Sequence, residues 1–215
     1  MTKVIKIDPN EATYKDLAPA ADALLSGGLI VGPTQSYYAL MALADKPAAL
    51  ERIATLKPGR GSDRAFLLLL DQKLRSHSYA REVTVEAEAL MDKFWPGLLT
   101  LLMPGHTGLH RLLLGKAKTV GLRVEGLATT RRLIRMVDRG ITGTSANPHL
   151  SPPPRTVGEV LAYYPKGIDL ILDAGPTAGG PASTVVDMAG PVPWIFRKGA
   201  IPVMDIVAVC PTVSE

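Results

Sequence analysis

The stretch Gly143-Thr144-Ser145-Ala146-Asn147 closes a short apolar segment with small polar side chains. Residues 140–143 read as a buried strand, and the Pro148 that follows prevents a simple continuation of regular structure. Ser145 and Asn147, whose side chains both donate and accept hydrogen bonds, therefore lie two residues apart at the end of a strand. Ligands of open α/β sheets bind at that edge, so the stretch indicates a ligand site. An ordinary Asn-Pro turn is the alternative.

Length and composition indicate one globular domain. The chain has 215 residues, of which 47% are hydrophobic and 20% charged, enough to bury a full core. No apolar run is long enough to cross a bilayer and no apolar leader follows the first residues, so we expect a cytoplasmic protein without a membrane partner. The single cysteine, Cys210, excludes an internal disulfide, and we expect it to be a small buried side chain.

The charge balance suits an anionic partner without identifying it. A formal net charge of +4 and a pI near 9.2 are compatible with a phosphate-bearing ligand or with nucleic acid. Aromatic residues make up only 5% of the chain, so a stacking platform for single-stranded nucleic acid has little support.

Short β-type segments alternate with amphipathic helical segments along the chain. Thr156 and Glu159 form a capping box, which predicts a helix that runs to about Tyr164. The strands outnumber the crossover helices that an all-parallel sheet needs, which favours an α/β fold with a twisted mixed sheet flanked by helices. We expect a single domain with a core over about 14–201 and a short C-terminal tail. The expected helices are 14–25, 46–56, 83–94, 129–137 and 156–164, and the expected strands are 4–7, 29–32, 66–70, 98–103, 119–124, 140–143, 169–172, 184–187 and 193–197.

A basic loop follows the second expected helix. It reads Lys57-Pro58-Gly59-Arg60-Gly61-Ser62-Asp63-Arg64; its glycines allow a ligand to approach the backbone and its three cations can hold phosphates. A solvated basic loop is the alternative. The P-loop, dinucleotide-binding and zinc-protease motifs are absent, and the four histidines lack convincing metal spacing, so no metal site is predicted.

Arg123 lies inside the expected strand 119–124, whose other residues are mostly apolar. A buried charge costs several kcal/mol unless it is paired. Arg123 therefore meets either an internal carboxylate, which the sequence alone favours, or an anionic ligand.

Taken in order, these segments resemble the YrdC/TsaC family of threonylcarbamoyl-AMP synthases. The resemblance spans about residues 14–201, and it is the ordered set of motifs that is specific. Residues 33–40 resemble the family's P-T-[DE]-T-x-Y-G-L, 57–60 its K-x-R-P loop, 94–100 its W-P-G-P-x-T, 119–124 its strand with a central arginine, 144–147 its S-T-S-A-N, 183–187 its S-T-V-[VI]-D and 196–200 its R-x-G.

The resemblance implies a YrdC-like fold with a concave basic cleft and a nucleotidyltransferase of tRNA processing. It would make threonylcarbamoyl-AMP and pyrophosphate from ATP with Mg²⁺, L-threonine and bicarbonate, for the t6A modification at position 37. The further partners implied are tRNA or double-stranded RNA and the downstream threonylcarbamoyl-transferase proteins. Threonine would be bound by Ser36, Arg123, Ser145 and Ser183, and ATP by Lys57, Arg60, Arg64, Thr119, Asn147, Arg155 and Arg197, with Lys57 and Arg60 also the catalytic cations.

The chain departs from the family pattern at several positions, and two other functions stay open. A YciO-like paralogue with a different nucleotide-linked substrate is one, and an RNA-binding protein without this activity is the other. The departures are Gln35, Ser36, Ala39, Gly61, Leu69 and residues 148–151, where N-x-S-G is usual.

Overall fold

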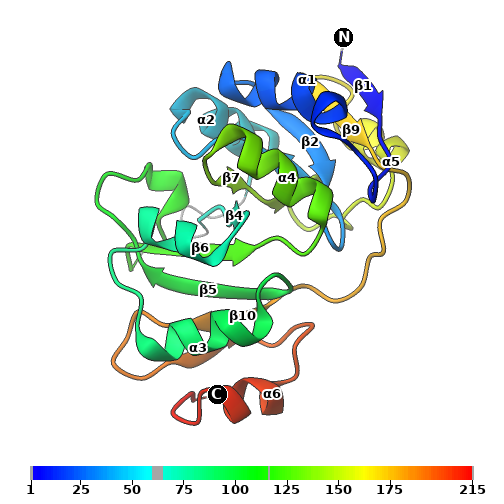
Figure 1. Cartoon of the computed structure of the whole chain (residues 1–215). Helices are drawn as coiled ribbons and strands as arrows, with labels where there is room; N and C mark the ends of the chain where they lie inside the picture. The colour runs from blue at the N-terminus through cyan, green and yellow to red at the C-terminus, as the bar shows by residue number, and fades with distance from the viewer. Residues whose placement is uncertain (1, 60–64, 116, 215) are drawn as a thin grey trace.

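The structure, a computed structural model, describes residues 2–59, 65–115 and 117–214. Within these ranges the strands form two mixed sheets, drawn one above the other in Figure 1. The five-stranded sheet has the order β1 (Lys3–Lys6), β9 (Leu170–Asp173), β2 (Ile30–Pro33), β3 (Tyr38–Met41), β8 (Thr144–Ser145). The six-stranded sheet has the order β11 (Trp194–Arg197), β10 (Thr184–Asp187), β5 (Leu99–Pro104), β6 (Thr119–Val124), β4 (Leu68–Leu70), β7 (Ile141–Thr142).

The predicted mixed α/β class is confirmed, but the strands divide between two sheets where the sequence analysis expected one. The division is sharpest around Gly143. β7 pairs with β4 of the six-stranded sheet, β8 pairs with β3 of the five-stranded sheet, and only Gly143 lies between them. A hydrophobic pattern marks where a strand lies but not which partner it takes, so the switch was not predictable from it.

Helices cover both sheets. α1 (Tyr14–Leu25) and α4 (Ala128–Val137) pack together and bury Leu17, Leu24 and Leu133 against the five-stranded sheet. A second cluster buries side chains of α2 (Pro47–Leu56), α3 (Val85–Phe94), α5 (Val157–Tyr163) and α6 (Val203–Val209). In Figure 1, α3 crosses in front of β10 and α6 lies below it. Two short 3₁₀ segments occupy Lys73–Ser78 and Arg111–Leu113.

Most predicted elements are confirmed to within one or two residues. The capping box is present: Glu159 N donates to the Thr156 hydroxyl, and Thr156 N donates to the Glu159 carboxylate. Cys210 is buried with a free thiol, as expected. Strand β3 was not predicted, and α6 lies in the expected C-terminal tail. No helix in the described part of the chain is long and apolar enough to span a membrane.

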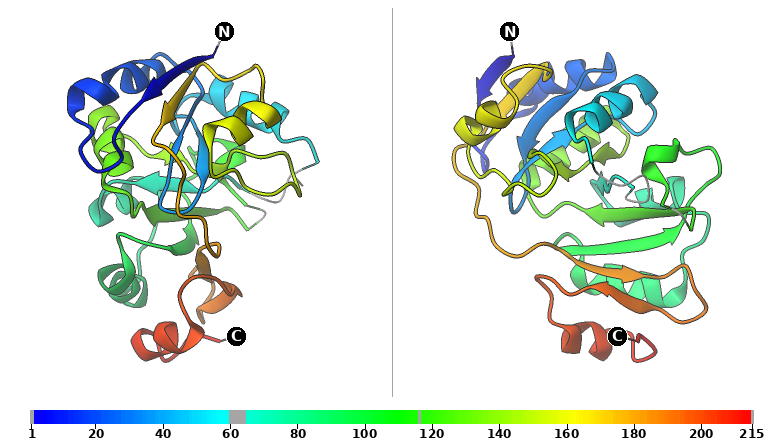
Figure 2. Two further views of the ribbon diagram at one scale, coloured as in Figure 1. Left: turned by 90° about the vertical axis from the view of Figure 1, so that its right-hand side faces the viewer. Right: turned by 180° about the vertical axis from the view of Figure 1, so that it is seen from behind.

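The connection between β9 and β10, residues 174–183, is here called the strap. It runs along one side of the molecule from the five-stranded to the six-stranded sheet (Figure 2). The turn between β2 and β3 and the first residue of β3 hold it by hydrogen bonds. The Tyr38 hydroxyl donates to Gly175 O (2.7 Å) and accepts from Ala174 N (3.0 Å), the Tyr37 hydroxyl donates to Gly180 O (2.7 Å), and Gly179 N donates to Ser36 O (2.8 Å).

A β-bulge in the edge strand β11 sets the direction of Arg197. Ile195 pairs with Val186 and belongs to the buried cluster, whereas Arg197 pairs with the adjacent Val185, so Phe196 is the extra residue. The bulge places Ile195 and Arg197 on opposite faces although they are two residues apart. Arg197 thereby reaches the face of the sheet that carries Thr100, which also pairs with Val185.

Candidate functional site

Arg123 meets an internal carboxylate, the partner that its sequence context favoured. Its Nη2 donates to Glu125 Oε2 at 2.7 Å, and the Arg123 and Glu125 residues are only 5% and 0% exposed. Arg123 Nε is also buried, and no atom of the described residues accepts a hydrogen bond from it. Leaving such a donor unsatisfied costs about 1–3 kcal/mol, so this nitrogen is suited to an acceptor on a ligand.

A second arginine, Arg197, belongs to the edge strand β11 and is exposed as a residue. Arg197 donates from Nη2 to the Ser183 hydroxyl (3.0 Å) and carbonyl (2.8 Å), and the Ser183 hydroxyl also lies 2.9 Å from that of Thr100. Burial lowers the pKa of the Arg197 guanidinium, and the positive charge of Arg123 lowers it further. An anion bound near both guanidinium groups would offset their repulsion.

Lys57 connects the end of α2 to the Ser145–Asn147 segment. The residue ends α2, is buried, and donates from Nζ to Ser145 O at 2.7 Å and to Asn147 O. The Asn147 side-chain amide donates to Ser151 O (2.6 Å) and Pro148 O (3.0 Å). Its Oδ1 is buried, with no donor among the described residues, so this part of the site offers an acceptor.

The strap brings Arg155 toward Ser36. Arg155 Nε donates to Thr177 O at 3.0 Å, and a Cβ added to Gly179 would lie 3.1 Å from that nitrogen. Gly179 N in turn donates to Ser36 O. Ser36 is buried, whereas Arg155 is exposed.

Three predicted residues remain, and the structure describes one of them, Thr119. Arg60 and Arg64 lie outside the described residues. Thr119 begins β6, four residues before Arg123, which corresponds to about 13 Å along a strand. The two side chains share one face of that strand but lie near its opposite ends.

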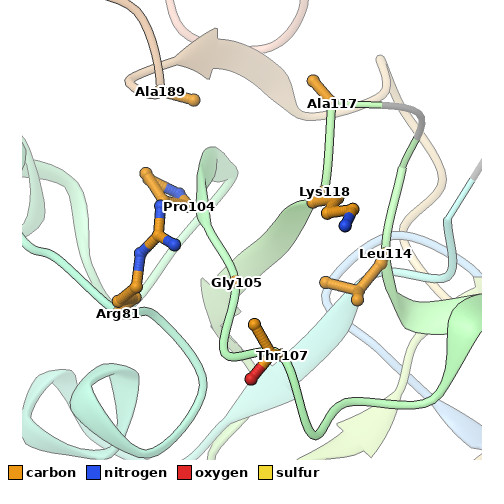
Figure 3. A pocket seen from close by; sticks show the side chains of 8 residues that line it. All are labelled: Arg81, Pro104, Gly105, Thr107, Leu114, Ala117, Lys118 and Ala189. Atoms are coloured by element: carbon orange, nitrogen blue, oxygen red, sulfur yellow. The ribbon is translucent and has the colours of Figure 1, made fainter.

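A pocket of about 290 Å³ lies at the Thr119 end of the sheet and contains none of the predicted residues (Figure 3). Arg81 and Lys118 stand on opposite sides of it, and Pro104 and Gly105 continue from β5 along its edge. This pocket is a different place from the clusters around Arg123 and Lys57. The concave basic cleft that the resemblance implies stays a prediction.

Glu125 is the site residue that the sequence analysis missed. A signal was present, because residues two apart in a strand share a face and Glu125 follows Arg123 at that spacing. Its Oε1 also accepts from Gln35 N (2.7 Å) and Leu127 N (3.2 Å). In residues 2–59, 65–115 and 117–214, no group of three or more His, Cys, Asp or Glu side chains is placed to hold a metal ion.

Comparison with known proteins relates the whole chain to one family. The family model Sua5_yciO_yrdC, described as "Telomere recombination", matches residues 22–199. Threonylcarbamoyl-AMP synthase of Pyrococcus abyssi is 32% identical over 206 residues, which cover 96% of this chain and 60% of that protein. This chain therefore spans about three fifths of that relative's length.

Solved structures give the same relationship. Sua5 of P. abyssi complexed with L-threonine superposes with a TM-score of 0.90 at 29% identity, covering 100% of this chain and 62% of that one. E. coli YciO superposes with a TM-score of 0.85 at 27% identity, covering 94% of this chain and 98% of that one. From the matched family model and the 32% identity over almost the full length, this chain belongs to the Sua5/YciO/YrdC family.

Proposed function

We propose that this chain is an L-threonylcarbamoyladenylate synthase that supplies the t6A modification of tRNA. The observation that carries the proposal is the buried Arg123, with an Nε that no described residue satisfies, in a fold that superposes on a threonine-bound Sua5. A relative of 32% identity that is named threonylcarbamoyl-AMP synthase supports the same activity.

The amino-acid end of the site is assigned to four residues. The carboxylate of L-threonine would accept from Arg123, because a guanidinium and a carboxylate form charge-assisted hydrogen bonds that are stronger than neutral ones. The hydroxyls of Ser36, Ser145 and Ser183 would bind the remaining polar groups of threonine. Ser183 lies within 3.0 Å of Arg197, which would connect this end to the nucleotide.

The nucleotide end is assigned to the cations, with ATP entering as its Mg²⁺ complex. Lys57 already holds the carbonyls of Ser145 and Asn147, so its charge lies at the end of β8. Arg197, Arg155 and the basic-loop arginines Arg60 and Arg64 would offset the charge of the triphosphate, and Asn147 and Thr119 would make polar contacts with ATP.

The reaction needs no covalent bond to the protein. The amine of threonine takes up CO₂ derived from bicarbonate, releasing water and giving a carbamate. A carbamate oxygen then attacks the α-phosphorus of ATP, the bond from that phosphorus to the bridging oxygen breaks, and pyrophosphate leaves. The chain contributes position and fixed positive charge, the two effects that dominate phosphoryl and nucleotidyl transfer. In this proposal the product passes to threonylcarbamoyl-transferase proteins and tRNA in the cytoplasm.

A YciO-like activity on another nucleotide-linked substrate is the second candidate. E. coli YciO superposes on this chain with a TM-score of 0.85 at 27% identity, which supports this candidate. Gln35, where the synthase pattern has an acidic residue, is one difference from that pattern. Ala39, which lies buried opposite Ser145, is a second difference from the synthase pattern.

Pyrophosphate release separates these functions. The protein is incubated with MgATP and bicarbonate, with and without L-threonine, and Arg123→Ala is compared with Arg139→Ala, which removes a partly exposed arginine paired with Asp45. Threonine-dependent release that falls at least ten-fold in Arg123→Ala and is kept in Arg139→Ala supports the synthase. Release that is indifferent to threonine supports the YciO-like activity. No release, together with salt-dependent binding of tRNA, would overturn both in favour of an RNA-binding protein.

A further inference from the structure

One buried carboxylate receives hydrogen bonds from three separate parts of the fold. Glu125 follows β6 directly and is 0% exposed. Its Oε2 accepts from Arg123 Nη2 at 2.7 Å, and its Oε1 accepts from the backbone N–H groups of Gln35 (2.7 Å) and Leu127 (3.2 Å). Arg123 belongs to the six-stranded sheet, Gln35 to the β2–β3 turn of the five-stranded sheet, and Leu127 is the residue before α4.

The carboxylate therefore positions two predicted threonine-binding residues, Arg123 and Ser36. It holds the guanidinium of Arg123, and through Gln35 N it holds the turn in which Ser36 is the next residue. Since Glu125 is fully enclosed, it has no surface on which to touch a substrate itself. Its influence on a ligand must pass through Arg123 and the turn.

The two oxygens of the carboxylate accept from all three donors. A glutamine in its place has one acceptor oxygen, and its NH₂ group would face an N–H donor on the other side. The ion pair with Glu125 fixes Nη2 of Arg123, whereas Nε has no acceptor among the described residues.

We propose that Glu125 is a positioning residue for the amino-acid substrate: it orients Arg123 so that Nε meets the substrate carboxylate, and it fixes the β2–β3 turn beside it. The inference rests on the proposed function and assigns to it a residue that acts without touching the substrate. Positioning of this kind affects threonine binding more than ATP binding, because the described partners of Glu125 lie at the amino-acid end.

The first test separates the two substrates kinetically. Glu125→Gln is expected to raise the KM for L-threonine about ten-fold or more and to leave the KM for ATP within about two-fold, because a lost hydrogen bond to a charged group has that magnitude. Glu125→Asp keeps the charge on a shorter side chain and is expected to give a smaller increase; it also serves if Glu125→Gln does not fold. The matched control is Asp169→Asn, whose carboxylate likewise binds an arginine (Arg52) and a backbone N–H (Leu29) but at the opposite end of β2.

A double variant tests whether the effect passes through Arg123. In an Arg123→Ala background, Glu125→Gln is expected to raise the threonine KM by a smaller factor than in the wild type, because only the effect through the β2–β3 turn remains. Equal increases of the threonine and ATP KM values, or full additivity of the two substitutions, would overturn the proposal.

A spectroscopic measurement keeps the inference separate from the proposed activity. The Nε–H signal of Arg123, assigned by its absence from Arg123→Ala, is followed in nitrogen-15 NMR spectra without substrate. A sharp signal in the wild type that broadens or moves in Glu125→Gln supports the positioning role, even if the wild type releases no pyrophosphate with threonine and the proposed function fails. An unchanged signal would overturn the inference while leaving the proposed function intact.

Discussion

At Gly143, the residue between the two sheets, one added methyl group should lower the stability of the fold. A Cβ built there would lie 2.5 Å from Leu69 Cγ and 2.7 and 2.8 Å from its two Cδ atoms. Leu69 is fully buried and pairs with both Arg123 and Ile141 in the sheet, so it has no open space into which to turn. Gly143→Ala therefore forces an overlap at the place where the chain passes beside the site.

The expected cost is the difference between two opposing effects. Overpacking a core costs about 1–3 kcal/mol, and replacing glycine by alanine recovers about 0.4–1 kcal/mol because the unfolded chain loses freedom. The φ angle of Gly143 is not positive, so no backbone strain is added. We expect a net loss of about 1–2 kcal/mol, which corresponds to a fall in Tm of about 2–8 °C for a chain of this size.

Gly126→Ala is the matched control. The added Cβ would lie only 1.8 Å from Gln35 Oε1, a closer approach than any at Gly143. Gln35 is exposed, however, and its flexible side chain can rotate away. The control should change the free energy of unfolding by no more than about 0.5 kcal/mol.

Urea unfolding of the wild type and both variants measures the difference. Leu69→Ala alone should cost about 2–5 kcal/mol, and in the Gly143→Ala background it should cost less by about 1 kcal/mol or more, because it removes the overlapping atoms. Equal stability of the two glycine variants, or full additivity with Leu69→Ala, would refute the reasoning.

Two further predictions concern Leu150 and Tyr38. Leu150 has a φ of 68° and is 90% exposed, so Leu150→Gly should relieve left-handed strain and stabilise the fold by about 1 kcal/mol or less, measured by urea unfolding; a loss of stability would contradict this. Burial raises the pKa of the Tyr38 hydroxyl to about 12, against about 10 in an unfolded chain, so its contribution to stability is complete below pH 10 and is lost as the pH rises toward 12. The stability difference between the wild type and Tyr38→Phe should therefore shrink over that interval in unfolding curves, and a constant difference would count against the assignment.

Local sequence patterns predicted most helices and strands well, because the residues that form each pattern also stabilise the element. The apolar spacing and the glycine stop of α1, and the capping box at Thr156, are local in this sense. The pairing of strands is not local. β3 was read only as part of a polar motif, although its four residues are fully enclosed between β2 and β8.

The same distinction applies to the site. The burial of Arg123 followed from its apolar strand, and the structure supplies Glu125 as its internal partner, while Nε stays unmatched among the described residues. The meeting of Lys57 with the carbonyls of Ser145 and Asn147 joins segments about 90 residues apart, which no spacing rule predicts. The resemblance placed these residues in one site, and their roles toward ATP and threonine stay predictions.

The bulge in β11 reverses which face of the sheet the following side chains occupy. With strict alternation, Arg197 would share the face of Ile195 and bring a full positive charge against the apolar cluster beneath α3 and α6. One extra residue moves that charge to the other side of the sheet without any change in the amino acids around it. Deletion of Phe196 would leave every candidate site residue in the sequence but would remove the bulge. Either Ile195 would then leave the apolar cluster or Arg197 would leave the site.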